Sequence, residues 1–419
     1  MKILIITRIY TALEDSIKTK SWQPRGMPAY YKLIERLNAQ NDIETDAVCL
    51  GKMSHNDINK KEIFKFDNLK IRFYVIPYVP IKIFKIFGAK IYGYLSGIVN
   101  EILHFLHCIN LVLHKNYDLV YIDRANIVIG AFLAAFLQKK VVVRFFGVGS
   151  LVKRTEGPKK WIKDPFKYLS YKAPFSYVIC TEDGSGSRYF FGKYLNKNTP
   201  YEILLNGVNA IDFSNTNANF LRQKYNIPPN HKVILFLTRL ERGKGTDLFI
   251  KSIVELAKIN DTFTAIVVGD GPLREDMEND AKKYRIGHKV IFERAVPHNR
   301  VYDYYLGADI YVSLNFLGNL CNTVLEAMSA GKCIVTLKKY EVDHTDEATE
   351  DILSGNALLI NKRRITEELA PLLCDLLDNK GKIEEFSDKT KKLSTTLLTN
   401  WDKRIDYEVT LLKKIACRQ

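Results

Sequence analysis

The sequence predicts an α/β protein with two doubly wound parallel sheets. Three observations support this prediction. Short apolar runs alternate with helical patterns over roughly the first half of the chain, the same alternation starts again at residue 233, and the Asn-rich stretch 206–232, with its Pro-Pro step, separates the two series. Alternating strands and helices are typical of parallel sheets covered by helices, and the polar stretch is typical of a domain linker. At 419 residues the chain is also long for a single core.

The first series begins with a buried strand and continues with strands that are each followed by a helix or loop. Helices are predicted at "AYYKLIERLNAQ" (29–40) and "NIVIGAFLAAFLQ" (126–138). The runs that predict strands are "KILIIT" (2–7), "DAVCL" (46–50), "DLVYI" (118–122), "VVVRFFG" (141–147) and "SYVICT" (176–181).

The second series repeats this alternation. Strands are predicted at "VILFLTRL" (233–240), "FTAIVVGDG" (263–271), "VIFERAV" (290–296) and "DIYVSLN" (309–315), and helices at 245–259, 273–286 and 300–308. A last helix follows, with Asn322 as its expected N-cap, an apolar stripe, and a left-handed stop at Gly331. Its stripe consists of Val324, Leu325 and Met328.

Composition indicates a globular protein that meets an anionic partner or surface. Hydrophobic residues make up 47% of the chain, and the formal net charge is +15. No nucleic-acid-binding motif accompanies this charge, so nucleic acid is not the expected partner. The seven cysteines are scattered without metal-ligand spacing, which predicts no metal site and a reducing, cytoplasmic location. The opening "MKILIITRIY" has too short an apolar run for a signal peptide.

Residues 81–98, "IKIFKIFGAKIYGYLSGI", predict a basic amphipathic helix. Its apolar residues recur at helical spacing while Lys82, Lys85 and Lys90 take the other side. Such a helix can lie at an anionic membrane interface, on the inner membrane face, or it can be an ordinary surface helix packed on a core. The following stretch is interrupted by charges and is expected to be too short to span a bilayer. The apolar residues are Ile83, Phe84, Phe87, Ile91, Tyr94, Leu95 and Ile98.

Two strand-end loops of the second series predict an anion site. Arg239 and Lys244, in "TRLERGKGTD", form a cation pair that can neutralise a diphosphate, and Gly271 belongs to the turn "VVGDGPL". Alone, the first loop could equally be a solvated basic loop. Glu326 raises a similar choice, because a glutamate near the start of a helix can simply complement the helix dipole.

Three stretches, "TRLERGKGTD", "VVGDGPL" and "LEAMSAGK", stand in an order and spacing that resembles the retaining GT-B glycosyltransferases of family GT4, or group 1. "LLNGVNAIDF" (204–213) is similar to the interdomain motif of that family, and "PRGMPAYYKLIERL" to its glycine loop. The resemblance implies an N-terminal acceptor-side domain over 1–207, a C-terminal nucleotide-sugar domain over 208–399, and a tail, 400–419, that crosses back to the first domain. The two Rossmann-like domains would face each other across a donor cleft.

The resemblance also implies roles for individual residues. Arg239 and Lys244 would be the catalytic charges that hold the departing diphosphate, without a metal ion or a cofactor. The donor would be a UDP- or GDP-linked sugar. Glu326 would accept hydrogen bonds from the ribose, and Gly26 would let the opposite loop approach the diphosphate. Backbone N–H groups near Asn322 and Thr323 would receive phosphate oxygens.

Two positions depart from the family pattern. Gly318 occupies the place of a glutamate that often holds the donor sugar, and Asn319 or Asn315 is expected to substitute for it. Phe146 occupies the place of an N-domain histidine, with Arg144, Asp123 and Arg124 as nearby alternatives. These departures leave the sugar, and the activity itself, open.

Three functions are therefore compared. The leading interpretation is a hexosyltransferase that acts on a saccharide or lipid-linked acceptor in surface polysaccharide or glycolipid synthesis. The runner-up is a catalytically weak GT-B subunit that binds a nucleotide or a partner protein. A GT-B epimerase lacks an evident acid and base motif, and "VGDGPL" is not the GxGxxG of a dehydrogenase.

Overall fold

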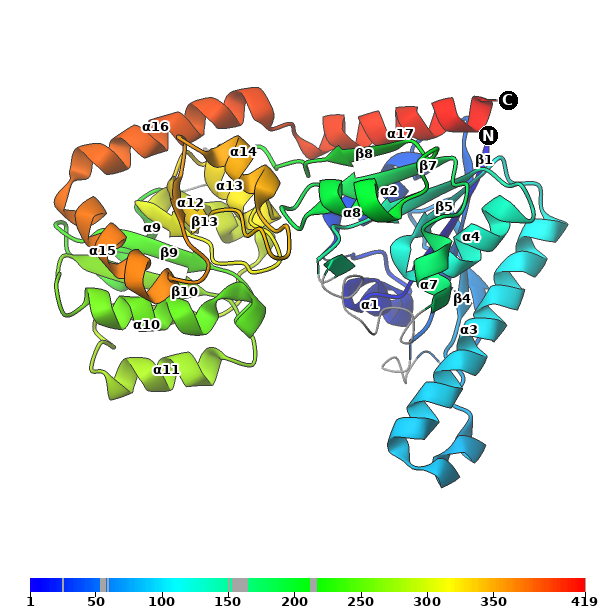
Figure 1. Ribbon diagram of the computed structural model, residues 1–419, viewed down its shortest axis with the longest axis horizontal. Helices are drawn as coiled ribbons and strands as arrows, with labels where there is room; N and C mark the ends of the chain where they lie inside the picture. Colours follow the sequence, from blue (N-terminus) through cyan, green and yellow to red (C-terminus); the bar gives the residue numbers. More distant parts are fainter. Residues whose placement is uncertain are drawn as a thin grey trace.

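The computed structural model describes residues 1–24, 26–52, 58, 60–149, 151–152, 165–211 and 217–418. These residues form two α/β domains that lie side by side and are joined by two crossings of the chain (Figure 1). The first crossing follows β8 (Tyr201–Leu204), and the second precedes α17 (Trp401–Cys417). The two crossings touch, because Val208 and Asn400 form a parallel β-bridge.

The N-terminal sheet has, within the described ranges, eight strands in the order β3-β4-β2-β1-β5-β6-β7-β8. All of them pair in parallel except β3. Its central strands are buried on both faces, as expected for parallel strands between helical layers. The strands not yet given bounds are β1 (Lys2–Arg8), β2 (Glu44–Leu50), β3 (Glu62–Phe64), β4 (Arg72–Ile76), β5 (Leu119–Asp123), β6 (Val141–Phe145) and β7 (Tyr177–Thr181).

Helices cover both faces of this sheet. In α2 (Pro28–Asn38), Pro28 suits the first turn, and Tyr30, Leu33, Ile34 and Leu37 form the buried stripe. Together with α1 (Thr11–Thr19) and α17, α2 builds the core on one face. The other face is covered by α3 (Ala89–His114), α4 (Ile127–Ala135), α7 (Pro165–Ser170) and α8 (Ser187–Tyr194).

The C-terminal sheet has, in the described part of the chain, six parallel strands in the order β11-β10-β9-β12-β13-β14. From β9 the chain adds β10 and β11 on one side and later adds β12, β13 and β14 on the other. Open parallel sheets bind ligands at such a switch point, here between β9 and β12. The strands are β9 (Lys232–Leu237), β10 (Phe263–Val268), β11 (Val290–Glu293), β12 (Ile310–Val312), β13 (Cys333–Leu337) and β14 (Leu358–Ile360).

Two helical layers enclose this second sheet. The helices α10 (Thr246–Leu256), α11 (Arg274–Lys283) and α15 (Ile365–Asp378) pack on one face. The helices α9 (Phe220–Tyr225), α12 (Val301–Gly307), α13 (Asn322–Ser329) and α14 (Glu347–Leu353) pack on the other. From there α16 (Lys380–Leu397) leads to α17, which returns to the N-terminal domain (Figure 1). The prediction of two parallel α/β sheets is thus confirmed.

The start of α13 differs from the prediction, whereas its end agrees with it. The N-cap of α13 is Cys321, and Asn322 is its first helical residue, so Glu326 lies beyond the first turn. Gly331 does adopt the expected left-handed conformation, with φ of +63°.

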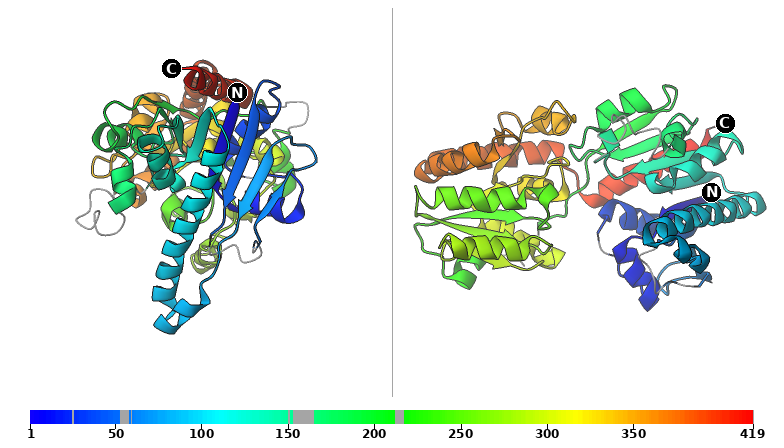
Figure 2. Two further views of the ribbon diagram at one scale, coloured as in Figure 1. Left: turned by 90° about the vertical axis from the view of Figure 1, so that its right-hand side faces the viewer. Right: turned by 60° about the horizontal axis from the view of Figure 1, so that its bottom comes forward.

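Residues 81–98 do not form one helix. A short 3₁₀ helix, η1 (Lys82–Phe87), ends at Gly88, whose φ of +84° breaks the helical path before α3 begins. The side chains of Phe87 and Lys90 lie outside the described residues. Within α3, Ile91–His114 is long and apolar enough to cross a membrane by length and composition, contrary to the expectation of a shorter stretch. Figure 2 shows η1 and the first part of α3 projecting away from both domains.

Candidate functional site

A cavity of about 340 Å³ lies between the two domains, within the size range of small-molecule sites. Loops after β9 and β12 form its C-domain wall. Loops after β6, β7 and β8, together with the start of α2, form its N-domain wall. The described residues therefore place the cavity at the carboxyl ends of strands from both sheets.

Arg239 and Lys244 both line this cavity. The Arg239 side chain is 74% exposed, and its Nη1 lies 3.3 Å from Oε1 of Glu241. Lys244 ends the 3₁₀ turn η3 (Arg242–Lys244), and among the described side chains it has no carboxylate within 4.0 Å. The two cations that the sequence singles out thus face one space.

Glycines bring the neighbouring loops close to the loop that carries these cations. A Cβ on Gly271 would lie 2.4 Å from the carbonyl oxygen of Leu240, and a Cβ on Gly245 would lie 2.5 Å from Cβ of Leu314. Gly271 is not among the described residues that line the cavity. It supports the Arg239 loop from behind instead.

The N-terminus of α13 also faces the cavity, through Cys321, Asn322 and Thr323. The side chain of Asn322 is held by the segment that joins the two domains, because Nδ2 of Asn206 donates to its Oδ1 at 2.7 Å. Asn206 belongs to the segment that leaves β8 and itself lines the cavity. The start of α13 is therefore tied to the first crossing between the domains.

Glu326 is buried one turn further along α13, with 7% of its surface exposed. Oη of Tyr305 donates a hydrogen bond of 3.1 Å to its Oε2, and Nε2 of His298 lies 3.7 Å from its Oε1. Burial raises the pKa of Glu326 to about 7. Burial and the charge of Lys32, on α2, lower the pKa of His298. Glu326 does not line the cavity itself but stands behind the helix start.

Asn319 does not face the cavity, contrary to the expected sugar contact. Its side chain is fully buried. Its Oδ1 accepts hydrogen bonds from Ser313 and from the backbone of Asn315, and its Nδ2 donates 2.9 Å bonds to the carbonyl of Asn315 and to Asp346. Asn319 is thus a structural residue of the loop. Asn315 lines the cavity, but its amide donates to the carbonyl of Gly318.

Gly318 lies directly against the N-terminal domain. A Cβ at this position, where φ is +125°, would come within 2.3 Å of the carbonyl oxygen of Asp183 and 2.7 Å of the amide nitrogen of Ser185. No residue with a side chain fits at this position in this arrangement of the domains.

The N-domain wall of the cavity contains residues that sequence reasoning missed. Thr181, Asp183 and Asn206 line it, together with Phe146 and the first residues of α2. Asp183 follows β7 in "TEDGSGS", and a glycine-rich turn at a strand end was the available signal. Gly26, with φ of +63° and open space around it, precedes the cavity-lining residues Met27–Ala29.

The three N-domain alternatives to Phe146 do not line the cavity in the described structure. Arg144 is fully buried and donates a 3.0 Å hydrogen bond to Thr181. Asp123 is buried and accepts hydrogen bonds from Thr7 and Asn126. Arg124 lies in the short 3₁₀ turn η2 (Arg124–Asn126). Among the described residues there is no group of three or more His, Cys, Asp or Glu side chains suited to a metal ion.

The family model described as "Glycosyl transferases group 1" matches residues 217–393, which are most of the C-terminal domain and its cation loop, α13 and β13. This domain belongs to the group 1 glycosyltransferases. The match covers the three motifs on which the resemblance rests, and it ends before α17.

A curated relative of the chain is the phosphatidylinositol N-acetylglucosaminyltransferase gpi3 subunit of Schizosaccharomyces pombe. The two are 25% identical over 202 residues, which are 47% of this chain and 43% of the relative. The chain spans less than half the length of the curated relatives that it matches first.

Two solved structures share the whole fold of the chain. The sucrose-phosphate synthase of Thermosynechococcus elongatus is 15% identical and superposes with a TM-score of 0.70, covering 99% of each chain. HepE of Anabaena, solved in complex with UDP, is 16% identical with a TM-score of 0.68 and covers 99% of this chain and 100% of its own. The fold of the chain is therefore GT-B.

Proposed function

We propose that this chain transfers a hexose, with retention, from a UDP- or GDP-linked donor to a saccharide or lipid-linked acceptor. One observation carries the proposal: Arg239, Lys244 and the N-terminus of α13 face the same cavity between the domains. A guanidinium, an ammonium and free helical N–H groups together form a site for a diphosphate. The family of the C-terminal domain supports this choice.

In this proposal the two cations act on the departing group. Negative charge grows on the diphosphate as its bond to the sugar breaks, so Arg239 and Lys244 stabilise the transition state more than the ground state. No described carboxylate lies within 4.0 Å of Lys244, so the charge of this lysine is not already neutralised, which favours this role. No metal ion is required for this neutralisation.

In this proposal Glu326 accepts hydrogen bonds from the ribose of the donor. Its Oε1 faces the half-exposed ring of His298, while Tyr305 holds its other oxygen. Two vicinal hydroxyls donate well to one carboxylate. A buried glutamate whose pKa is raised to about 7 gains most from such donors, since they stabilise its charged form.

The projecting arm, η1 with α3, supports a membrane-linked acceptor. One side of α3 is buried at Ser96, Asn100, His104, Cys108 and Val112, at intervals of one helical turn. Asn100 also bonds both the amide and the carbonyl of Val79. Because this side already packs against other parts of the chain, the arm is suited to lie on a bilayer rather than to cross it.

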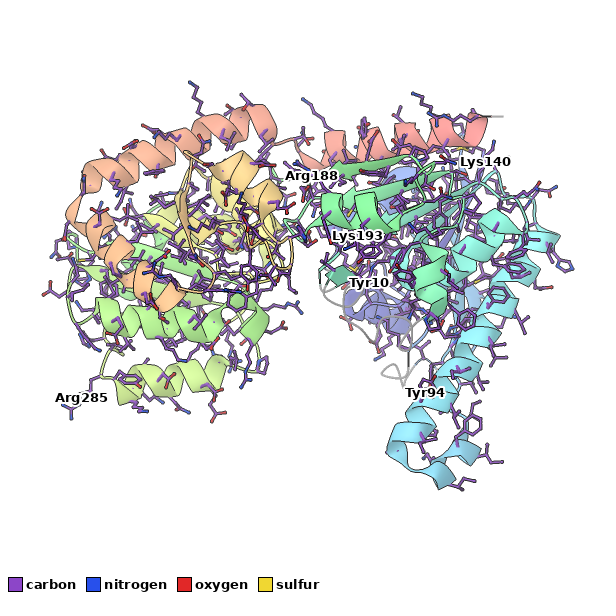
Figure 3. All side chains as sticks on the ribbon, viewed as in Figure 1. Tyr10, Tyr94, Lys140, Arg188, Lys193 and Arg285 are labelled. Carbon is purple, nitrogen blue, oxygen red and sulfur yellow. The ribbon has the colours of Figure 1, made fainter. Side chains whose placement is uncertain are left out.

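The opposite side of the arm is apolar and exposed. Ile86 is 77% exposed and Tyr94 is 71% exposed, and Figure 3 shows Tyr94 on the part of α3 that stands away from the domain. Lys82 and Lys85 beside them are also exposed and suit anionic head groups. The further exposed apolar residues on η1 and α3 are Ile83, Ile91, Ile98, Ile102, Leu103, Leu106 and Leu113. The phosphatidylinositol in the name of the Schizosaccharomyces pombe relative is consistent with such an acceptor.

A catalytically weak subunit is the second candidate, and one observation favours it. Gly318 removes the glutamate that family members place against the sugar, and the contact with Asp183 leaves no room to restore it. This subunit would still bind a nucleotide.

Product release decides between the two candidates. The purified protein is incubated with UDP- and GDP-sugars, with water-soluble and lipid-linked acceptors in parallel, and free UDP or GDP is measured. Release that depends on an acceptor supports the transferase. Nucleotide binding without any release, with every acceptor extract, favours the subunit.

A further inference from the structure

Asp183 is the one carboxylate among the described residues that line the cavity. It lies on the N-domain wall, whereas the two cations of the cavity, Arg239 and Lys244, lie on the C-domain wall. Among the described side chains no cation lies within 4.0 Å of Asp183. An acidic group of this kind repels a diphosphate and attracts hydrogen-bond donors.

The loop after β7 holds this carboxylate with one oxygen available. The backbone N–H of Ser185 donates a 3.0 Å hydrogen bond to Oδ1, and the Ser185 hydroxyl donates to the same oxygen. Oδ2 lies beside Gly147, where a Cβ would come within 1.9 Å of it. Oδ2 therefore fits only because residue 147 has no side chain. The two hydrogen bonds to Oδ1 fix the orientation of the carboxylate.

Asp183 also touches the loop that precedes α13. Its carbonyl accepts a 3.1 Å hydrogen bond from the N–H of Leu320, and it packs against Gly318. The two side-chain amides of that loop are already engaged, because Asn315 donates to Gly318 and Asn319 donates to Asn315 and Asp346. The carboxylate next to this loop, that of Asp183, thus comes from the N-terminal domain.

We propose that Asp183 accepts hydrogen bonds from hydroxyl groups of the sugar that is transferred, and so takes part in selecting the donor. The proposal rests on the proposed function, since it needs a nucleotide sugar in the cavity. With the diphosphate held by Arg239 and Lys244, the sugar is the hydroxyl-rich part of the donor that remains to be bound. A neighbouring carboxylate that accepts from two hydroxyls selects for their positions.

Burial is consistent with this role. It raises the pKa of Asp183 to about 7, with the charge of Glu182 acting in the same direction. A mostly buried carboxylate without a cation gains from any ligand that donates to it.

The test compares binding of nucleotides with binding of sugar nucleotides. Asp183→Asn removes the charge at nearly constant shape, and Asp183→Ser removes the second oxygen. The control is Glu182→Gln, because Glu182 is the adjacent carboxylate and lies outside the cavity lining. Calorimetry with UDP, GDP, UDP-glucose and GDP-mannose is run on all four proteins, and melting temperatures check that each is folded.

Both Asp183 variants should bind UDP or GDP within about twofold of the parent and bind the matching sugar nucleotide about tenfold more weakly. The control should change neither. Equal losses for nucleotide and sugar nucleotide, or no loss at all, overturn the role of Asp183 and leave the proposed function standing. If the parent binds none of the four compounds, the proposed function fails, and this inference fails with it.

Discussion

Nε of Arg144 lies 3.4 Å from Oε1 of Glu408, and both side chains are fully buried. The pair joins β6 to α17, the helix that returns from the C-terminal domain. Tyr121 donates a 2.6 Å hydrogen bond to Glu408, and Arg404 adds one of 2.8 Å. Burial alone would raise the pKa of Glu408, but the charges of Arg144 and Arg404 hold it below its ordinary value. The second crossing is therefore anchored by a buried charge network.

Glu408→Ala should lower the free energy of unfolding by about 3 to 5 kcal/mol, because it leaves the Arg144 charge buried without a partner. Urea unfolding of the whole chain measures this. Asp406→Ala is the matched control on the same helix, since Asp406 is exposed and pairs with Arg36 at the surface; it should cost less than about 1 kcal/mol. Similar losses for the two variants would contradict the anchoring role.

Glu326→Ala should weaken binding of UDP or GDP by about 1.5 to 3 kcal/mol, through the loss of charge-assisted hydrogen bonds to the ribose. Calorimetric titration measures this, and the melting temperature shows whether α13 stays folded. A variant that binds like the parent would leave Glu326 as no more than a partner of the helix dipole.

Glu326 should also make stability depend on pH. Its folded pKa of about 7 lies above the ordinary value of 4.5, so the folded state holds the extra proton between these values. The resulting stabilisation is complete below about pH 4.5 and is lost as the pH rises through 7.

The measurement for this effect compares the parent with Glu326→Gln, which cannot titrate. From pH 5 to pH 8 the difference in unfolding free energy should shift in favour of the variant, by up to about 3 kcal/mol. A difference that stays constant over this range would show that the carboxyl group keeps an ordinary pKa.

The fold was predictable because buried parallel strands leave a strong local pattern. Every residue of β5, β6 and β7 is buried, and each of these strands was located from its apolar run. The cation pair was predictable for a related reason: Arg239 and Lys244 follow β9 directly, and strand ends of a parallel sheet point to the ligand edge.

Contacts between distant segments were not predictable. Asn319 resembles a ligand residue in the sequence, but Asp346, 27 residues later, takes its amide. Asp183 follows β7 in a glycine-rich turn, but its contact with Gly318 of the other domain leaves no local pattern in the sequence. The break at Gly88 was missed because apolar periodicity continues across it, while a single glycine with positive φ changes the helix direction.

Replacing Arg239 or Lys244 by glutamine should lower turnover by more than it weakens donor affinity, because their effect grows as charge develops on the diphosphate. Steady-state kinetics and calorimetry on the same variants separate the two effects. Arg242→Gln is the matched control, since Arg242 is a cation of the same loop that does not line the described cavity. Equal losses in turnover and affinity would reduce the pair to a binding role.

The projecting arm should bind anionic vesicles in a salt-sensitive way. Each lysine near an anionic surface contributes about 1 kcal/mol, so replacing Lys82, Lys85 and Lys90 by glutamine should weaken vesicle co-sedimentation at least tenfold. Neutral vesicles should bind both proteins equally and weakly, through the apolar side chains alone. The control replaces Lys282, Lys283 and Arg285 by glutamine. These residues lie on the C-terminal domain, where Figure 3 labels Arg285.

The apolar side of the same arm gives an independent measure. Ile86→Ser and Tyr94→Ser should reduce the salt-resistant part of vesicle binding while leaving the melting temperature unchanged, because both side chains are mostly exposed. If these variants unfold at a lower temperature, the arm packs against protein instead of lipid. Equal sedimentation of the lysine variant, its control and the parent would likewise make the arm an ordinary surface helix. Loss in the arm variants alone would direct the acceptor search to lipid-linked sugars, since the arm would then hold the protein at the bilayer surface.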